Sequence, residues 1–253
     1  LLSRRQRQMC IRDRNCTAVD IAYTPADLSR LKKAGKKAVM LGIENGYAIG
    51  KDITNVERFR HRGVVYMTLC HNGNNDICGS ARYNEEELGV STFGEQVIKE
   101  MNRVGMMVDV SHAGEKSFYD ALAISGKPIV ASHSSARALC DHPRNLTDDQ
   151  LKALAAKGGV AQVCMYSGFL RKNGEATIKD AIEHLNHMVN VMGIEHVGIG
   201  TDFDGDGGIT GCASASELIN FTRRLLLERY SGESIRLIWG GNFLRVMEEV
   251  QRK

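Results

Sequence analysis

The sequence lacks the features that mark several large classes of protein. No apolar run approaches the ~18–20 residues needed to cross a bilayer, so we predict no membrane span in this segment. The seven cysteines are scattered, odd in number and never spaced as C-x-x-C, which argues against a disulfide framework or a zinc knuckle. We expect most of them to be small buried side chains. No G-x-S-x-G elbow for a serine nucleophile occurs.

An extended basic surface is also missing. The formal charge is +3, but residues 1–14 alone carry five arginines and one aspartate. The remainder of the chain has 28 basic and 29 acidic residues and is nearly neutral. Without a basic stripe there is no electrostatic footprint for phosphate, so we predict no nucleic-acid partner.

Residues 1–14 resemble nothing else in the chain. They contain no apolar h-region and no small-residue cleavage site, so they are not a signal peptide. We interpret them as a non-native tail and residues 15–253 as one partial domain. We therefore expect the true N-terminus to be missing, and the sequence predicts no compartment.

Short apolar runs alternate with helical patterns along the rest of the chain. Continuous apolar runs indicate parallel strands buried on both faces, and alternation with helices indicates right-handed crossovers. The predicted strands are 38–44, 64–70, 106–111, 128–132, 159–166 and 196–201. The predicted helices are 24–35, 55–62, 93–104, 114–124, 148–157, 178–192, 215–229 and 242–251. This pattern predicts an α/β fold of the TIM-like (β/α)8 barrel type.

Two helix starts carry the sequence of a capping box. Thr147 with Gln150 and Ser214 with Glu217 have the required spacing of three residues. The polar stretch 72–89 is long for a connection in such a fold, and long loops at a barrel rim are usually functional.

Five polar residues stand where apolar runs end. Since the ends of parallel strands meet at one rim, where barrel enzymes keep their chemistry, we expect these side chains to converge. They are Glu44, His71, His112, His133 and Asp202. Any one histidine in such a place is more often a hydrogen-bonded rim residue than a ligand. Three histidines, a glutamate and an aspartate that all follow apolar runs in the same way favour metal binding and catalysis.

Imidazole nitrogen and carboxylate oxygen are the donors that zinc favours, and a catalytic site keeps one position open. His112 and His133, with Glu44 from an earlier strand, supply such a set. His184 and His187 could also bind metal, but an exposed helix face is the preferred interpretation. Residues 202–207 imitate the start of a calcium loop, yet Ala213 occupies the position that needs a glutamate.

Seven short segments, in chain order, resemble successive motifs of the membrane (renal) dipeptidases, the M19 metallopeptidases of the amidohydrolase superfamily. The segments are 42–46 (GIENG), 69–72 (LCHN), 108–112 (VDVSH), 131–135 (ASHSS), 142–145 (HPRN), 200–205 (GTDFDG) and 240–243 (GGNF). The resemblance extends from about residue 36 to residue 248.

The resemblance implies a binuclear zinc site and a hydrolytic role for each matching residue. Glu44 matches the carboxylate that bridges two Zn²⁺ ions, and His112 and His133 complete the second metal site. His71 matches a residue that steadies the oxyanion and binds substrate. Arg144 matches the arginine that holds the substrate carboxylate, for which its planar fork is suited. Asp202 matches the substrate-binding aspartate that moves a proton between the metal-bound water and the leaving amine.

The family also carries a His-x-Asp pair on its first strand, and no His-x-Asp occurs here. We therefore expect the first two barrel strands to be absent, with six strands present, and this chain by itself to be inactive. The predicted function is hydrolysis of dipeptides by a metal-bound hydroxide, with a dipeptide substrate and a homodimer as expected partners. Two alternatives stay open. One is another amidohydrolase acting on N-acyl amino acids or β-lactam-like amides, and the other is an inactive zinc-binding barrel.

Overall fold

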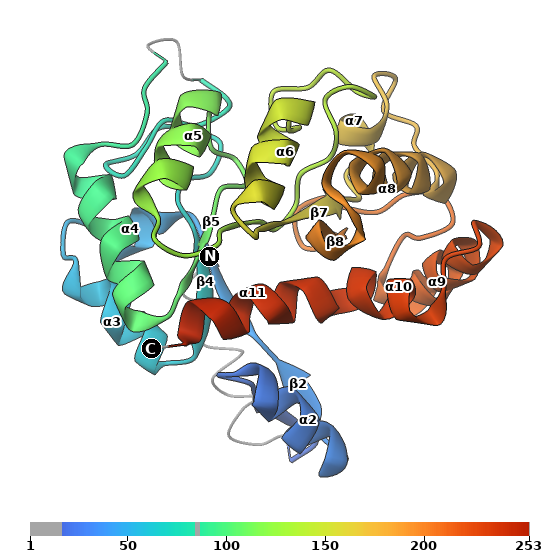
Figure 1. Ribbon diagram of the computed structural model, residues 1–253, viewed down its shortest axis with the longest axis horizontal. Helices are drawn as coiled ribbons and strands as arrows, with labels where there is room; N and C mark the ends of the chain where they lie inside the picture. Colours follow the sequence, from blue (N-terminus) through green and yellow to red (C-terminus); the bar gives the residue numbers. More distant parts are fainter. Residues whose placement is uncertain (1–16, 84–86, 253) are drawn as a thin grey trace.

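The computed structural model describes residues 17–83 and 87–252, and its centre is a parallel sheet of six strands (Figure 1). The strands lie side by side in chain order, and each neighbouring pair is parallel. They are β3 (Leu41–Glu44), β4 (Val64–Thr68), β5 (Met107–Asp109), β6 (Val130–Ala131), β7 (Val160–Cys164) and β8 (Val197–Gly200). The six predicted strand positions and the α/β class are confirmed, although the strands are shorter than predicted.

The sheet is curled into a half-barrel, with β3 and β8 at its two edges. In the described part of the chain these two edges do not pair with each other. The prediction of a TIM-like barrel is thus confirmed in the coarser form of a curled parallel sheet with crossover helices.

Helices follow the strands and cover the sheet. Those between strands are α3 (Thr54–His61), α4 (Thr92–Val104), α5 (Glu115–Ile124), α6 (Asp148–Ala156), α7 (Ser167–Leu170) and α8 (Ile178–Met192). Those after β8 are α9 (Leu218–Leu227), α10 (Gly232–Arg236) and α11 (Asn242–Gln251). Short helical turns complete the chain at η1 (Gly46–Ile49), η2 (Ile194–His196), η3 (Ala215–Glu217) and η4 (Leu237–Gly241).

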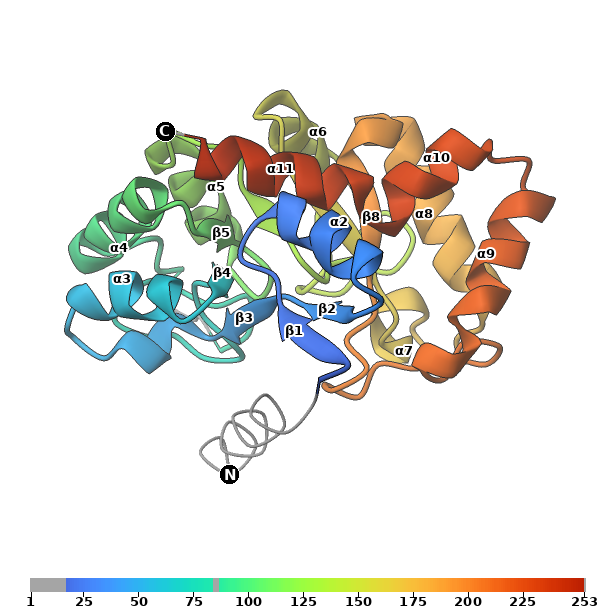
Figure 2. The same ribbon diagram turned by 90° about the horizontal axis from the view of Figure 1, so that it is seen from below.

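The prediction of one strand over 38–44 is wrong in its extent. Residues Lys37–Val39 form β2, which pairs with β1 (Val19–Ile21) in a separate parallel sheet, and the chain enters the main sheet only at Leu41. The helix α2 (Pro25–Lys33) joins β1 to β2, and this small unit lies beside α11 (Figure 2). β1 was not predicted, because three half-buried residues give too short an apolar signal.

Apolar packing occurs in two clusters. The larger one lies between the main sheet and the helices that connect its strands. In the smaller one, Val246, Met247 and Val250 of α11 pack with the buried strand residues Val65, Met107, Val130 and Val160. In Figure 1, α11 runs across the sheet at the side opposite to the long loops. The last helix therefore braces one end of the strands and leaves the other end free for chemistry.

The two predicted capping boxes have different outcomes. Thr147 Oγ1 accepts a hydrogen bond from Gln150 N at 3.2 Å, and Gln150 Oε1 accepts one from Thr147 N at 2.9 Å, which confirms the first box. The second is wrong, because Ser214 Oγ bonds to Ser216 Oγ and makes no cap. Glu217 instead accepts a hydrogen bond from Ala213 N at 2.8 Å.

This difference predicts different costs for two otherwise similar substitutions. Thr147→Ala should lower the free energy of unfolding by about 1 kcal/mol, since it leaves a helix N-terminus without its cap. Ser214→Ala should change it by less than about 0.5 kcal/mol, since an exposed hydroxyl outside a cap contributes little. Urea denaturation of both variants measures the two values. Equal losses at the two positions would contradict the assignment of the caps.

The predictions about the cysteines, the N-terminal tail and a membrane span can be compared with the structure only over the described residues. The five described cysteines, Cys70, Cys78, Cys140, Cys164 and Cys212, are free and buried as predicted. Residues 1–14, interpreted as a tail, lie outside the described residues, as do Cys10 and Cys16. Within the described ranges, none of the helices has the length and apolar character needed to cross a membrane.

Candidate metal centre and active site

Three side chains predicted as metal ligands converge where their strands end. Glu44 Oε1 lies 3.1 Å from His112 Nε2 and 3.3 Å from His133 Nε2. The two Nε2 atoms are 2.9 Å apart. Glu44 is the last residue of β3, while the histidines follow β5 and β6. Residues separated by up to 89 positions in the chain therefore present their ligand atoms to one point.

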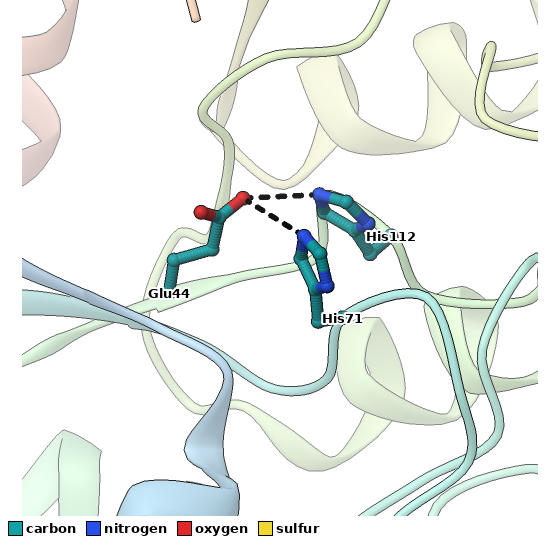
Figure 3. Close-up of side chains that lie close together, drawn as sticks. All are labelled: Glu44, His71 and His112. Carbon is teal, nitrogen blue, oxygen red and sulfur yellow. Dashed lines mark hydrogen bonds and ion pairs between the residues drawn. The ribbon is translucent and has the colours of Figure 1, made fainter. Parts of the chain in front are cut away.

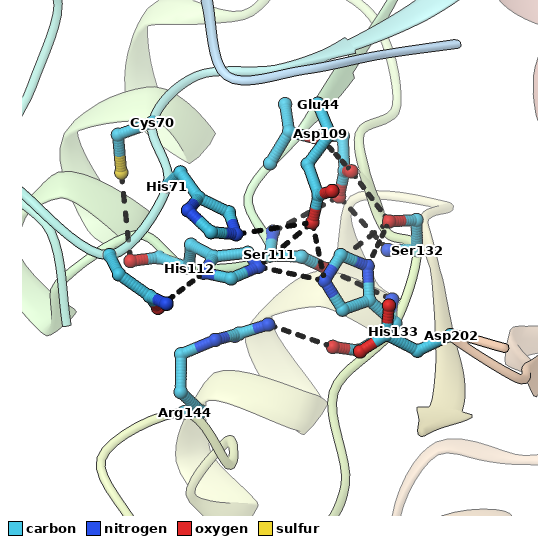
Figure 4. A network of polar contacts seen from close by, with 12 residues as sticks. Glu44, Cys70, His71, Asp109, Ser111, His112, Ser132, His133, Arg144 and Asp202 are labelled. Carbon is cyan, nitrogen blue, oxygen red and sulfur yellow. Dashed lines mark hydrogen bonds and ion pairs between the residues drawn. The ribbon is translucent and has the colours of Figure 1, made fainter. Parts of the chain in front are cut away.

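His71 and Asp202 also lie close to Glu44. His71 Nε2 is 3.8 Å from Glu44 Oε1, and its ring lies against that of His112, tilted by 36° with centroids 4.3 Å apart (Figure 3). The ligand atoms of Asp202, Glu44 and His133 all lie within 4.8 Å of one another. The structure thus brings together all five polar residues that end apolar runs (Figure 4).

The loop segment 72–83 shapes the position of His112. His112 has φ +69°, a left-handed conformation that is uncommon outside glycine. The loop holds it there, because Ala81 N donates to His112 O at 2.7 Å. Asn72, at the start of the same loop, places its Oδ1 3.1 Å from His112 Nδ1. The loop therefore orients a candidate ligand.

The electrostatics of the cluster suit a cation. Burial lowers the pKa of His112 to about 3, so its ring is neutral at pH 7. An ordinary carboxyl group has a pKa of about 4, so Glu44 carries a negative charge at pH 7. Since Asn72 Oδ1 can only accept, His112 Nδ1 carries the ring proton and Nε2 presents a lone pair. A lone pair facing a carboxylate oxygen at 3.1 Å repels it unless a positive charge lies between them.

The spacing of these atoms also fits a metal ion. Four ligands at the ~2.0–2.1 Å typical of zinc in a tetrahedral site lie ~3.3 Å from one another. The three distances of 2.9, 3.1 and 3.3 Å approach that value. Both the chemistry and the spacing of the donor set therefore fit zinc.

Asp202 is held by a tight turn after β8. It has φ +56°, and its carbonyl accepts hydrogen bonds from Gly205 N at 3.0 Å and Gly207 N at 2.7 Å. A side chain at position 207 would lie 2.1 Å from Thr201 O, so the turn needs glycine there. Burial raises the pKa of Asp202 to about 6, with Glu44 adding to the shift and His133 opposing it. The glycines that imitate a calcium loop thus serve to fold the chain around Asp202.

Arg144 lies buried beside the cluster. Its residue is 3% exposed, its Nη2 donates to His133 O at 3.3 Å, and its Cζ lies 5.2 Å from the ring centroid of Phe169. Among the described residues, no acceptor pairs with its Nε. A buried guanidinium with an unused donor is costly unless an anion approaches it. Arg144 is therefore suited to bind an anionic group.

A cavity of about 440 Å³ opens next to the candidate metal ligands Glu44 and His133. Glu44, His133 and Asp202 line it, together with Tyr66 and Trp239. Cavities of ~300–1,000 Å³ with a few convergent polar groups are typical of small-molecule sites. The cavity is thus large enough for a small substrate.

Three residues that support the two candidate histidine ligands, directly or through one neighbour, were not predicted from the sequence. Asn72 contacts His112, Ser132 Oγ lies 2.8 Å from His133 Nδ1, and Asp109 accepts a hydrogen bond from Ser132. The signal for Asp109 was present, because it is a lone charge inside the apolar run 106–110. No comparable signal marks Asn72 or Ser132 in such polar surroundings.

The interpretation of His184 as part of an exposed helix face is wrong. The residue is 1% exposed, and its two ring nitrogens contact Ala136 N at 3.1 Å and Leu170 O at 3.2 Å. It therefore joins α8 to the loop after β6 and to the end of α7. His187 lies 2.7 Å from Asp148 Oδ1 and belongs to a separate contact.

Comparisons with known proteins agree with the resemblance noted in the sequence. The family model described as membrane dipeptidase (peptidase family M19) matches residues 4–253. An uncharacterized dipeptidase of Schizosaccharomyces pombe is 38% identical over 232 residues, which cover 88% of this chain and 56% of that protein. The chain thus spans about half the length of the curated relatives it matches.

Two crystal structures are similar to the whole fold. The probable dipeptidase PvdM from Pseudomonas aeruginosa matches with a TM-score of 0.90 and 30% identity, covering 95% of this chain and 76% of that one. A metallo peptidase from Rhodobacter sphaeroides, liganded with a phosphinate mimic of the dipeptide L-Ala-D-Ala, matches with a TM-score of 0.90 and 25% identity. That match covers 98% of this chain and 74% of the other.

The family match extends over almost the entire chain, and the resemblance found in the sequence motifs is confirmed. On these grounds the chain belongs to the membrane dipeptidase family, peptidase family M19.

Proposed function

We propose that the full-length protein is a zinc-dependent dipeptidase that hydrolyses the single peptide bond of its substrate. The observation that carries the proposal is the convergence of Glu44 Oε1, His112 Nε2 and His133 Nε2 within 3.3 Å of one another. Membership of the M19 family supports the reaction class, and the cavity beside the cluster supports a small substrate.

Glu44, His112 and His133 would hold one zinc ion, and Glu44 would be shared with a second. Zinc when bound lowers the pKa of water and polarises a carbonyl group. The second ion needs further ligands, and by family resemblance we assign them to a His-x-Asp pair on a strand outside this sequence. In this proposal β3 to β8 correspond to the third to eighth strands of a complete barrel. A homodimer stays a prediction.

The chain's own residues would then divide the remaining work. The Asp202 carboxylate lies close enough to Glu44 and His133 to take a proton from an attacking water molecule and return it to the leaving nitrogen. His71 Nε2 lies 3.8 Å from Glu44 Oε1 and would stabilise the developing oxyanion. Arg144 offers a buried, unused donor to the terminal carboxylate of a dipeptide.

The phosphinate mimic of L-Ala-D-Ala bound to the Rhodobacter sphaeroides relative supports a dipeptide with a D-residue at its C-terminal position. The proposal can be tested on the full-length protein with zinc by assaying L-Ala-D-Ala and L-Ala-Gly. We expect hydrolysis of at least one of them, loss of activity on removal of metal by a chelator, and recovery when zinc is returned.

The two alternatives predict different substrate profiles in the same assay. A dipeptide whose C-terminus is amidated should lose about 10–100-fold in kcat/KM, since a charge-assisted hydrogen bond contributes about 1.5–3 kcal/mol. Faster hydrolysis of N-acetyl-alanine or a β-lactam than of any dipeptide would favour the other amidohydrolase. Zinc binding at full stoichiometry without hydrolysis of any of these amides would favour the inactive barrel.

A further inference from the structure

A buried carboxylate behind the metal centre has no part in the function proposed so far. Asp109, at the end of β5, is fully buried and accepts four hydrogen bonds. Its Oδ1 accepts from Ser111 N at 3.0 Å and Ser132 N at 2.9 Å. Its Oδ2 accepts from Thr68 Oγ1 at 2.5 Å and Ser132 Oγ at 2.6 Å. Asp109 therefore ties together the ends of β4, β5 and β6 and contacts Ser132, the residue before His133 (Figure 4).

The Ser132 hydroxyl connects this carboxylate to a candidate metal ligand. Ser132 Oγ lies 2.6 Å from Asp109 Oδ2 and 2.8 Å from His133 Nδ1. A hydroxyl has one proton to donate, and two oxygens 2.6 Å apart need a proton between them. Its other possible acceptor, Ser111 Oγ, is more distant at 3.4 Å and carries no charge. The Ser132 proton therefore points to Asp109.

The direction of that bond determines which nitrogen of His133 carries the ring proton. Since the Ser132 proton is used, the 2.8 Å contact with His133 needs a proton from Nδ1. A neutral imidazole with its proton on Nδ1 has a lone pair on Nε2. His133 Nε2 is the atom that faces Glu44 and His112.

We propose that Asp109, through the Ser132 hydroxyl, holds His133 in the tautomer whose unprotonated Nε2 faces the metal centre. Both Asp109 and Ser132 are then positioning residues, and the inference rests on the proposed metal-binding role of His133. His112 is oriented differently, by the neutral amide of Asn72. The two histidines thus differ in their hydrogen-bond partners. His133, which is connected to a carboxylate, is the stronger electron donor to a metal.

The substitution Asp109→Asn should reverse the direction of the hydrogen bonds from His133 through Ser132 to residue 109. The oxygen of the new amide must stay at the position of Oδ1, because two backbone N–H groups point at it and cannot turn away. Its NH2 group then takes the position of Oδ2 and donates to Ser132 Oγ. The Ser132 proton is released toward His133 Nδ1, so the ring proton moves to Nε2 and blocks the ligand position.

Nitrogen-15 NMR of the histidine rings in the metal-free chain at pH 8 tests the tautomer directly. We expect wild-type His133 to carry its proton on Nδ1 and the Asp109→Asn variant to carry it on Nε2. Assignment uses the resonance that disappears in His133→Gln. A wild-type ring protonated on Nε2 would overturn the proposal, even if the Asp109 variant fails to fold.

Zinc affinity, measured by competition with a chromophoric chelator, gives the second readout. Ser132→Ala should bind zinc about 10–100-fold more weakly, as expected for loss of a group that orients a metal-bound histidine. Ser132→Thr keeps the hydroxyl and should stay within about 3-fold of wild type. Ser134→Ala is the matched control, because the hydroxyl of this buried neighbour contacts, among the described residues, only Ser111 Oγ, at 3.5 Å.

A further control distinguishes the effect of the Ser132 hydrogen bonds on His133 from the effect of Asp109 on the stability of the strand ends. Thr68→Val removes the other hydroxyl at Asp109 Oδ2 but leaves Ser132 and His133 untouched, so zinc affinity should fall less than in Ser132→Ala. Equal zinc affinity of Ser132→Ala and Ser134→Ala would also overturn the proposal. Neither readout needs a substrate. A protein with the expected tautomer and zinc affinity but without dipeptide hydrolysis would refute the proposed function and leave this inference intact.

Discussion

Replacing Glu44 by glutamine should weaken zinc binding by at least about 100-fold and abolish hydrolysis in the full-length protein. The Glu44 carboxylate is the only described anion within 3.3 Å of both His112 Nε2 and His133 Nε2. Its glutamine replacement removes the negative charge and can turn an N–H group toward the ion. Residues that merely orient a ligand change metal affinity 10–100-fold, so the loss of a charged ligand should reach or exceed that range.

The measurement is the zinc content after dialysis against a chelator of known affinity, with dipeptide turnover measured on the same sample. Glu248→Gln provides the control, because this glutamate is exposed on α11. It should retain wild-type zinc content and activity. If Glu44→Gln kept its zinc at wild-type affinity, the assignment of Glu44 as a ligand would be wrong.

Replacing Asp202 by asparagine should lower kcat by about 10²–10⁴-fold while the zinc content stays unchanged. An amide is nearly the same size as a carboxylate but cannot carry a proton between water and a leaving amine, and general acid–base catalysis contributes about this factor. Asparagine also tolerates the left-handed conformation seen at this position, where φ is +56°. The turn around Asp202 should therefore survive the change.

Asp204 offers a matched control on the same turn. Its side chain also borders the cavity, but it does not belong to either group of metal-ligating atoms found in the described residues. Asp204→Asn should change kcat by no more than a few-fold. Loss of zinc from Asp202→Asn in parallel with the loss of activity would identify Asp202 as a ligand and refute its role as the proton carrier.

The strands and helices could be predicted from local sequence where local interactions determine them. The apolar runs at β4, β5, β7 and β8 mark strands because both faces of a parallel sheet are buried. Thr147 and Gln150 mark a helix start because the capping bonds lie within three residues. Ser214 and Glu217 have the same spacing, but neighbouring hydroxyl and amide groups compete successfully for their side chains. Spacing by itself could not reveal that competition.

The division of residues 37–44 between two sheets could not be predicted in the same way. The run 38–43 is continuous in hydrophobicity, yet Val39 O accepts a hydrogen bond from Ala22 N in one sheet and Leu41 starts the other. The choice depends on partners more than 15 residues away. The burial of His184 has a similar origin, because its two hydrogen-bond partners, Ala136 and Leu170, lie 48 and 14 residues away in the chain.

For the candidate site, the amino-acid sequence determined which residues end the strands and which chemical groups they bring to one rim. That followed from a regular architecture in which strand ends must meet, so Glu44, His112 and His133 could be chosen without coordinates. Only the tertiary structure decided how those groups are held. The contacts of His112 with Asn72 and of His133 with Ser132, and the four hydrogen bonds to Asp109, depend on hydrogen-bond directions and on distances of 2.5–3.1 Å. Such distances are set by the packing of whole strands and loops, and no local pattern of residues encodes them.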